Sequence, residues 1–248
     1  MPELVYTQEQ LLDLDQSRLP RHVAIIPDGN RRWAKMSGHS IFMGHRVGAD
    51  TVFNTVKAAR EVGIKAISFY LFSTENWKRS PEEVSFHMEL LQEFLLKHCE
   101  EMKENGVRLC TIGDLNVFPK EVIRVIDTVV AKTSEGKTID LILALNYGAR
   151  DEMRRAVQRI CHEQATENPA FKEITEDLIS SCLDTAPWGD PDLLIRTSGE
   201  MRVSNFLLWQ LSYAELYVTE VLWPDFTPNI FLDALIDFQT RQRRMGGM

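Results

Sequence analysis

Short, continuously apolar segments recur along this chain, and segments with helical periodicity separate them. Apolar runs lie at residues 23–26, 65–72 and 139–145. Each run is too short for a helix and lacks the alternation of a half-exposed strand, which is typical of a strand buried on both faces. Strands of this kind that alternate with helices predict a parallel sheet covered by helices.

The same patterns extend the prediction to six strands. Residues 107–112 and 193–195 are two more strands, and the segment 207–217 contains a sixth. Helices are expected at 44–62, from 81 to about 104, and at 119–132, 149–163, 174–183 and 229–241, with a short turn or helix through Trp33. We therefore predict a single-domain α/β fold with a parallel six-stranded sheet flanked by helices.

The longest of these helices follows Ser80. Ser80 can cap it, Pro81 suits its first turn, Glu83 completes a capping box, and Asn105-Gly106 ends it. Its apolar positions form one stripe, made of Val84, Met88, Leu91, Leu95 and Met102 and widened by Leu90 and Phe94. Such a stripe usually belongs to a core, and at a length of ~36 Å it could also form the wall of a long apolar tunnel.

Charge is unevenly distributed in this acidic chain. The net charge of −8 argues against a general nucleic-acid binder. Between residues 29 and 48, however, Arg31, Arg32, Lys35 and Arg46 occur without a single acidic residue. Such a local basic patch suggests a small anionic ligand, although a solvated basic face is the usual explanation for one stretch taken alone.

Cysteine spacing and the N-terminal segment constrain the cellular setting. Cys99, Cys110, Cys161 and Cys182 show no metal-ligand spacing, so we expect free, buried thiols in a reducing compartment. The acidic first residues lack an apolar segment, so no signal peptide is expected. No run approaches the ~18 apolar residues of a membrane span.

Four predicted strands end in polar clusters, at residues 28–30, 73–77, 146–148 and 196–202. In a parallel sheet these carboxyl ends share one edge, where ligands bind. The clusters would supply one carboxylate, Asp28, together with arginines that suit phosphate oxygens. A lone carboxylate among phosphates most simply holds Mg²⁺.

Several phosphate-handling classes lack support in the chain. GxxxxGK[ST], GxGxxG and GxSxG are absent, and no two aspartates are adjacent. What remains is a diphosphate site built from arginines and one metal-binding carboxylate, beside a large apolar interior.

Several ordered motifs resemble one family. They are PDGNRRWA at 27–34, Gly44-His45, FSTENWKR at 72–79, IRTSGE at 195–200, RVSNFLLWQ at 202–210 and YAELY at 213–217. Together they are similar to those of the cis-prenyltransferases, and particularly the bacterial undecaprenyl diphosphate synthases. The resemblance covers about residues 20–247.

The resemblance implies the activity and the cellular context. It implies Mg²⁺-dependent condensation of isopentenyl diphosphate onto an allylic diphosphate, usually farnesyl diphosphate, with each new double bond Z. Undecaprenyl diphosphate for a cell-wall lipid carrier is the implied product. It further implies a cytoplasmic homodimer that contacts membrane through its product. Residues 1–19 would form a polar N-terminal arm, and residues 20–248 the catalytic domain.

The resemblance also implies a role for each site residue. Asp28 and Asn76 would be catalytic, with Asn76 serving in proton removal, and Asp28 and Glu215 would hold the metal. The allylic diphosphate would contact Gly29, Asn30, Arg31, Arg32 and His45, with Trp33 beside it. The reaction centre would be lined by Ser73, Thr74, Glu75, Trp77 and Arg79. Isopentenyl diphosphate would contact Arg196, Arg202, Val203 and Ser204.

Some of these residues have structural alternatives. Asp28 could instead cap a helix, and Asn76 could have the purely structural role of shaping its turn. Glu215 lies in a predicted apolar strand, so it needs a metal or an arginine partner. His22, His39, His87, His98 and His162 are interpreted as structural or solvated. The apolar residues of the segment 207–217 are expected in the core and a dimer interface, and residues 244–246 match a tail motif of the family.

The chain departs from the family pattern at five positions. Ile41 replaces an arginine that often touches diphosphate, and Arg31 stands where glycine is common, so Arg31 is expected to offset the lost charge. Met201 replaces a histidine near the metal, and Pro27 a methionine. Leu71 stands where a small residue is common on the tunnel wall, which predicts a narrower tunnel and a shorter product.

A rival interpretation is a non-catalytic subunit that partners an active enzyme. Such subunits usually lose the aspartate and the arginines of the site. Both are present here, so the sequence favours the enzyme.

Overall fold

A parallel sheet of six strands forms the centre of the computed structural model, which describes residues 4–166 and 173–242. The strand order is β3-β4-β2-β1-β5-β6, and each neighbouring pair is parallel. The strands are β1 (His22–Ile26), β2 (Ala66–Ser73), β3 (Val107–Ile112), β4 (Ile139–Tyr147), β5 (Leu193–Arg196) and β6 (Glu215–Val218). The predicted α/β fold is confirmed.

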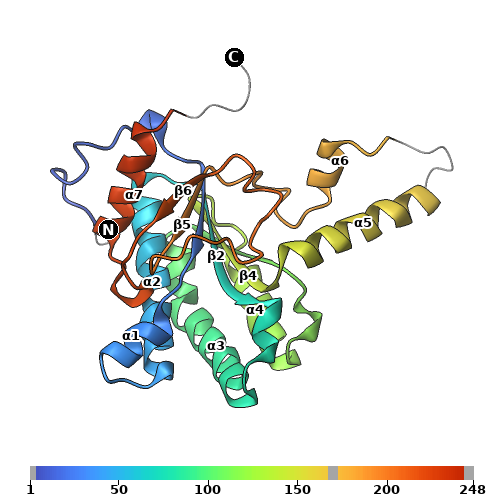
Figure 1. Ribbon diagram of the computed structural model, residues 1–248, viewed down its shortest axis with the longest axis horizontal. Helices are drawn as coiled ribbons and strands as arrows, with labels where there is room; N and C mark the ends of the chain where they lie inside the picture. Colours follow the sequence, from blue (N-terminus) through green and yellow to red (C-terminus); the bar gives the residue numbers. More distant parts are fainter. Residues whose placement is uncertain (1–3, 167–172, 243–248) are drawn as a thin grey trace.

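Helices connect these strands and cover the sheet (Figure 1). They are α1 (Asn30–Met36), α2 (Ile41–Val62), α3 (Pro81–Glu104), α4 (Lys120–Thr133), α5 (Ala149–Thr166), α6 (Glu176–Ser181) and α7 (Pro228–Thr240). Short 3₁₀ segments include η2 (Thr74–Lys78) and η4 (Trp223–Asp225). The outer half of α5 extends away from the sheet.

Some helices and strands begin or end at residues other than the expected ones, because a side-chain cap or a strand pairing determines the boundary. α2 begins three residues early, because the Ser40 hydroxyl accepts the Met43 N–H and caps the helix there. β4 continues to Tyr147, which pairs with Ser73 on the neighbouring strand. β6 occupies only the end of the segment 207–217 and extends one residue beyond it.

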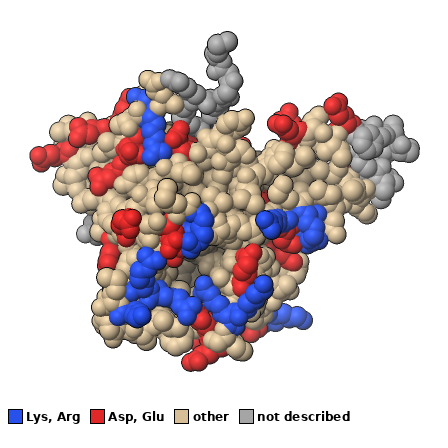
Figure 2. All heavy atoms as spheres, in the orientation of Figure 1, with Lys and Arg blue, Asp and Glu red and all other residues tan. Residues whose placement is uncertain are grey.

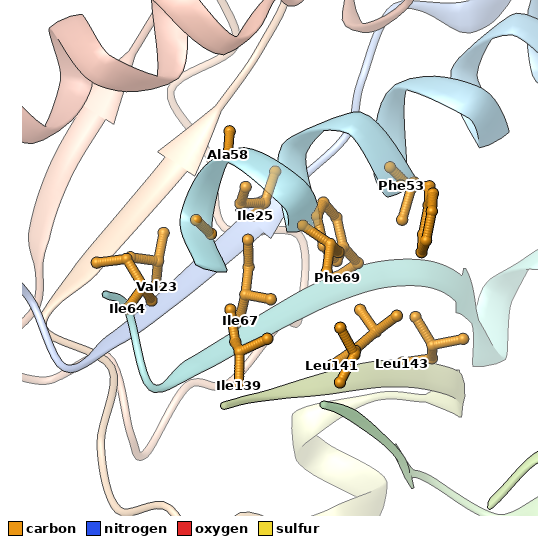
Figure 3. Close-up of a cluster of buried hydrophobic side chains, with 14 of the residues drawn as sticks. Val23, Ile25, Phe53, Ala58, Ile64, Ile67, Phe69, Ile139, Leu141 and Leu143 are labelled. Atoms are coloured by element: carbon orange, nitrogen blue, oxygen red, sulfur yellow. The ribbon is translucent and has the colours of Figure 1, made fainter. Parts of the chain in front are cut away.

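The main core lies between one face of the sheet and α2, α3, α4 and α7. Side chains of β1, β2 and β4, such as Ile25, Phe69 and Leu143, point towards α2 (Figure 3) and are completely buried. A smaller cluster covers the opposite face with Phe206 and Leu207. The sheet is therefore buried on both faces, as its continuous apolar strands predict.

The expected burial of the cysteines needs correction. The cysteines are free, but only Cys99 and Cys182 are buried, whereas Cys110 is half-buried and Cys161 is exposed. Cys161 lies on the outer half of α5, where α5 has left the sheet. Within the largely exposed N-terminal segment, Tyr6 is buried, and its hydroxyl donates to the Pro228 carbonyl at 2.7 Å.

Glycines bring α2 close to the loop after β1. A Cβ on Gly44 would lie 2.3 Å from the Asn30 carbonyl oxygen, and one on Gly48 would lie 2.3 Å from Asn30 Oδ1. Gly29 has a φ of 111°, in the left-handed region that glycine adopts without strain. These glycines place the start of α1 at the carboxyl edge of the sheet.

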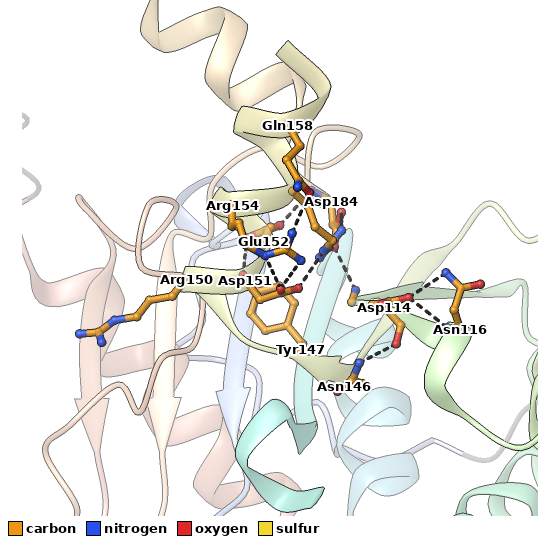
Figure 4. A network of polar contacts seen from close by, with 12 residues as sticks. Asp114, Asn116, Asn146, Tyr147, Arg150, Asp151, Glu152, Arg154, Gln158 and Asp184 are labelled. Carbon is orange, nitrogen blue, oxygen red and sulfur yellow. Dashed lines mark hydrogen bonds and ion pairs between the residues drawn. The ribbon is translucent and has the colours of Figure 1, made fainter. Parts of the chain in front are cut away.

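A buried polar network fixes the end of β4 (Figure 4). The Glu152 carboxylate, fully buried, accepts hydrogen bonds from Tyr147 Oη (2.5 Å), Gln210 Nε2 (3.1 Å) and the Asp184 N–H (2.9 Å). Burial raises the pKa of Glu152, and these hydrogen bonds partly oppose the shift. Because the folded-state pKa is raised, the folded chain binds more protons than the unfolded chain above pH ~4.5, and stability falls as pH rises through this window.

Tyr147→Phe is expected to lower the free energy of unfolding by about 1–3 kcal/mol at pH 7.5, because a buried carboxylate loses a donor. The loss should shrink as pH falls and Glu152 becomes protonated. Urea unfolding at pH 4.5 and 7.5 measures this, because the raised pKa of Glu152 lies above pH 4.5. Tyr213→Phe removes an exposed hydroxyl and is the matched control. Equal losses at both pH values would contradict the role assigned to ionised Glu152.

Candidate active site

The four polar clusters meet as predicted, because they follow β4, β2, β1 and β5, which are consecutive in the sheet. A cavity of about 380 Å³ opens beside them, between the sheet edge and the helices α1, α2 and α3. Figure 2 shows basic side chains gathered around a hollowed area in the lower half of this face. Its polar lining is Asp28, Asn30, Arg31, Arg32, His45, Asn76, Arg79 and His87.

Asp28 lies at the mouth of the cavity, held through its backbone and its side chain. Thr197 Oγ1 accepts the Asp28 N–H at 2.8 Å and donates to the Asp28 carbonyl at 2.6 Å. Arg196 Nη2 donates to Asp28 Oδ2 at 2.7 Å. The Asp28 side chain is about one-third exposed, so its carboxylate remains accessible to a ligand.

Arg196 is a buried arginine, with 4% of its surface exposed. Its Nη1 donates to Ser204 Oγ at 2.9 Å and to the Arg202 carbonyl, while Nε is buried and has no partner among the described residues. Arg202 itself is exposed, and Val203 packs partly against the smaller apolar cluster. Arg196, Arg202 and Ser204 therefore form one group beside Asp28.

A second basic group starts at α1. Arg32 donates to the Ser198 carbonyl and to Glu200, both at 3.0 Å. Glu200 also accepts from Arg202, so one carboxylate joins the two basic groups. Both arginines lower the pKa of Glu200. Two neighbouring groups of this kind can bind two anions next to one another.

Asn30 and His45 present polar atoms that lack partners. Asn30 Oδ1 and His45 Nε2 are both buried without a hydrogen bond in the described part of the chain. Burial lowers the pKa of His45 to about 3, so its imidazole is neutral at physiological pH. Unpaired buried polar atoms are costly, and a ligand in the cavity would pair them.

Glu83 lies in the first turn of α3, between two arginines. Its Oε1 is 3.5 Å from Arg31 Nη1 and 3.6 Å from Arg79 Nη1. The Arg31 side chain is 59% exposed, whereas Arg79 is half-buried. Ile41, which stands where relatives often have an arginine, is the first residue of α2.

The segment after β2 folds as a tight capped turn. Asn76 Oδ1 accepts the Ser73 N–H at 3.0 Å, and Asn76 is the residue of this turn that lines the cavity. Glu75 accepts from Asn205 Nδ2 at 3.1 Å, and Thr74 lies beside Gly148.

Three predicted site residues, Trp77, Trp33 and Glu215, do not line the cavity. Trp77 Nε1 donates to Asn146 Oδ1 at 2.8 Å, and Trp33 Nε1 donates to Asp225 Oδ1 at 2.7 Å. Glu215 begins β6 beside Leu193, at the opposite edge of the sheet from Asp28. Its partner there is Arg241, with Nη1 donating to Oε2 at 3.0 Å, so the arginine alternative holds within this chain. Residues 244–246, which match the tail motif, lie outside the described residues.

The residues present suit a magnesium ion held largely by substrate. The described residues contain no group of three or more His, Cys, Asp or Glu side chains that could hold a metal. Mg²⁺, however, commonly uses one or two carboxylates and takes its other ligands from phosphates and water. Asp28, an accessible carboxylate beside the arginines, fits such a site.

The deeper cavity is apolar. It is lined by Val52, Leu71, Phe72, Met88, Leu90, Leu91, Phe94 and Leu145. The α3 stripe therefore contributes to both the core and the cavity wall. Among the described residues no helix is long and apolar enough to cross a membrane.

The sequence interpretation missed three residues of this site. Thr197 clamps the Asp28 backbone, and Glu200 joins the two basic groups. His87 lines the cavity instead of serving only as a structural or solvated residue. Its position, three residues after Val84 and four before Leu91, places it on the α3 apolar face, and this spacing was the available signal.

Comparisons with known proteins identify the family of the chain. The family model for undecaprenyl diphosphate synthases matches residues 26–246. An isoprenyl transferase of Clostridium perfringens is 43% identical over 235 residues, covering 95% of this chain and 93% of that protein. One of Chlamydia trachomatis is 46% identical over 234 residues, covering 92% of each. Lavandulyl diphosphate synthase from Lavandula x intermedia, solved with dimethylallyl diphosphate, superposes with a TM-score of 0.90 at 33% identity, covering 93% of this chain and all of that one.

Proposed function

The chain belongs to the undecaprenyl diphosphate synthase family of isoprenyl transferases, and we propose that it elongates an allylic diphosphate with isopentenyl diphosphate in a Mg²⁺-dependent reaction. Farnesyl diphosphate is the proposed starter, and a polyprenyl diphosphate such as undecaprenyl diphosphate the proposed product. The observation that carries this proposal is one cavity with a carboxylate and arginines at its mouth and an apolar interior.

The allylic diphosphate is assigned to the cavity mouth at Gly29, Asn30, Arg31, Arg32 and His45. A dimethylallyl diphosphate is bound in the lavandulyl diphosphate synthase structure, which supports an allylic ligand in this fold. Breaking the bond between carbon and diphosphate leaves an allylic cation and a charged leaving group. The arginines stabilise the charge that develops on this leaving group.

Isopentenyl diphosphate is assigned to Arg196, Arg202, Val203 and Ser204. Because Glu200 joins this group to Arg32, the two diphosphates would lie side by side and their chains would meet near Asp28. Mg²⁺ held at Asp28 would neutralise diphosphate charge. Asn76 lines the cavity, which supports its assignment to the departing proton.

The product chain is assigned to the apolar interior. Each isoprene unit transfers apolar surface from water, at about 0.8 kcal/mol per CH₂. The proposed setting is a cytoplasmic homodimer that meets membrane only through its product and binds no nucleic acid. Exposed Leu208, Tyr213, Leu216 and Val218, on and near the edge strand β6, support an interface there.

The proposed activity is tested with labelled isopentenyl diphosphate and geranyl or farnesyl diphosphate, with and without Mg²⁺. Products are sized after dephosphorylation. Elongation only with Mg²⁺ is expected. Absence of elongation with both starters would refute the proposal and favour the non-catalytic subunit, against which the intact Asp28 and Arg196 already argue.

Leu71→Ala is expected to lengthen the products by one or more isoprene units, because Leu71 lies on the cavity wall and its removal widens the passage. Thin-layer chromatography of the dephosphorylated products measures this. Leu96→Ala is the matched control, since Leu96 lies on the exposed side of α3. An unchanged product ladder for Leu71→Ala would show that another part of the wall limits chain length.

A further inference from the structure

His87 lies on α3 at the cavity wall and packs against aromatic rings. Its ring centroid is 4.5 Å from that of His45 and 6.0 Å from those of Phe72 and Phe86. The ring is half-buried, so packing limits its orientation.

The contacts of His87 define its protonation. Nδ1 lies 2.6 Å from the Glu83 carbonyl oxygen, and Nε2 lies 3.2 Å from Arg79 Nη1. A carbonyl only accepts hydrogen bonds, and a guanidinium only donates them. The ring must therefore carry its proton on Nδ1 and accept at Nε2, which makes His87 a neutral imidazole of one tautomer.

Arg79 depends on this acceptor. Within the part of the chain that the structure describes, the bond to His87 is the only hydrogen bond that the Arg79 side chain makes. The Glu83 carboxylate lies 3.6 Å from the same Nη1 and adds a longer ion pair. Arg79 and His87 line the cavity together with Arg31 and His45.

We propose that His87 is a positioning residue for substrate binding: its neutral imidazole holds the Arg79 guanidinium at the cavity wall, where Arg79 receives the diphosphate of the allylic substrate. This inference rests on the proposed function, and it adds a residue that the family motifs do not include.

A pH dependence follows from the groups around the ring. Arg79 and Glu83 face His87 from its own segment, Arg31 from α1 and His45 from α2. Burial, reinforced by the charges of Arg79 and Arg31, lowers the pKa of His87, whereas Glu83 opposes the shift. Protonation would turn Nε2 into a donor facing Arg79 and place a charge beside two arginines. The KM for the allylic diphosphate should therefore rise as pH falls through this pKa.

Two substitutions separate this role from packing. His87→Phe keeps an aromatic ring without the acceptor, and at pH 8 it should raise the KM for farnesyl diphosphate about tenfold, the effect of one hydrogen bond to a charged group. Its kcat should stay within about twofold. His87→Gln can turn its amide oxygen towards Arg79 and should keep the KM near that of wild type.

The second measurement compares wild type with His87→Gln from pH 8 down to the lowest pH at which both proteins remain folded, because burial lowers the pKa of His87 below its ordinary value. The wild-type KM should rise relative to that of His87→Gln, which does not titrate there, and titration of the substrate affects both proteins equally. This comparison tests the proposal even if His87→Phe does not fold.

If the wild type is active and folded His87→Phe has an unchanged KM for farnesyl diphosphate, this inference alone is overturned. The same holds if His87→Phe shows a lower kcat without a change in that KM. A wild-type KM that falls towards acid pH relative to His87→Gln would overturn it too, because His87 would then act as a cation. A wild type that elongates no allylic diphosphate would overturn the proposed function and this inference with it.

Discussion

Asp28→Ala is expected to reduce kcat/KM by about a thousandfold or more, with isopentenyl and farnesyl diphosphates as substrates. Among the residues that the structure describes, Asp28 is the one carboxylate that lines the cavity, and the other charged side chains in the lining are arginines. Its loss would remove the proposed metal ligand and with it the proposed neutralisation of the leaving group, on which the rate of such a reaction strongly depends. Radiolabel incorporation at saturating Mg²⁺ measures the change.

The fold needs a separate control, because the Asp28 carboxylate also pairs with buried Arg196. Removing it leaves that guanidinium, within the described part of the chain, with its contacts to Ser204 and Arg202 alone. Asp28→Asn keeps an acceptor for Arg196 without the charge, and the backbone clamp by Thr197 remains in both variants. We expect Asp28→Asn to be inactive with a melting temperature close to that of wild type. Near-wild-type elongation by Asp28→Asn would refute the metal role.

The fold was largely predictable, because buried parallel strands leave a simple pattern. Continuous apolar runs predicted β1, β2 and β4, and the Ser80 cap predicted the start of α3, which begins at Pro81. The second half of the predicted capping box is wrong, because the Glu83 carboxylate faces Arg31 and Arg79 instead of the Ser80 N–H. The misplaced boundaries depend on single local contacts. The Ser40 cap of α2 is one, and the pairing of Tyr147 with Ser73 is another, and neither follows from hydrophobic periodicity.

The site was predictable where residues follow strands directly. Asp28 and Arg196 come at the ends of β1 and β5, so the topology alone brings them to one edge. Glu215 shows the limit of this logic. The prediction placed Glu215 in an apolar strand but did not say at which end of the strand it lies. Glu215 is the first residue of β6, at the amino ends of the strands, whereas Asp28 lies at their carboxyl ends.

Residues that act through a neighbour were hardest to predict. Thr197 uses its hydroxyl on the Asp28 backbone, and His87 on α3 accepts from Arg79, which lies in the segment before that helix. Such roles depend on side-chain direction, for which composition and spacing give little information. Only the position of His87 on the apolar face of α3 indicated that it would meet the cavity.

Arg196→Gln is expected to raise the KM for isopentenyl diphosphate about a hundredfold, while the KM for farnesyl diphosphate changes little. The Arg196 guanidinium is buried, charged and held beside Ser204, so its position is set before a diphosphate arrives. Glutamine loses both the charge and the paired donors that match phosphate oxygens. Arg196→Lys keeps the charge but not the fork, and it should restore only part of the affinity.

Initial rates with each diphosphate varied in turn separate the two KM values. Arg124→Gln, an exposed arginine of α4, is the matched control and should leave both unchanged. Because Arg196 also pairs with Asp28, its loss should lower kcat as well, through a less fixed carboxylate. If Arg196→Gln instead raised the KM for farnesyl diphosphate and spared that for isopentenyl diphosphate, the two diphosphate assignments would have to be exchanged. The group at α1 would then bind the incoming unit.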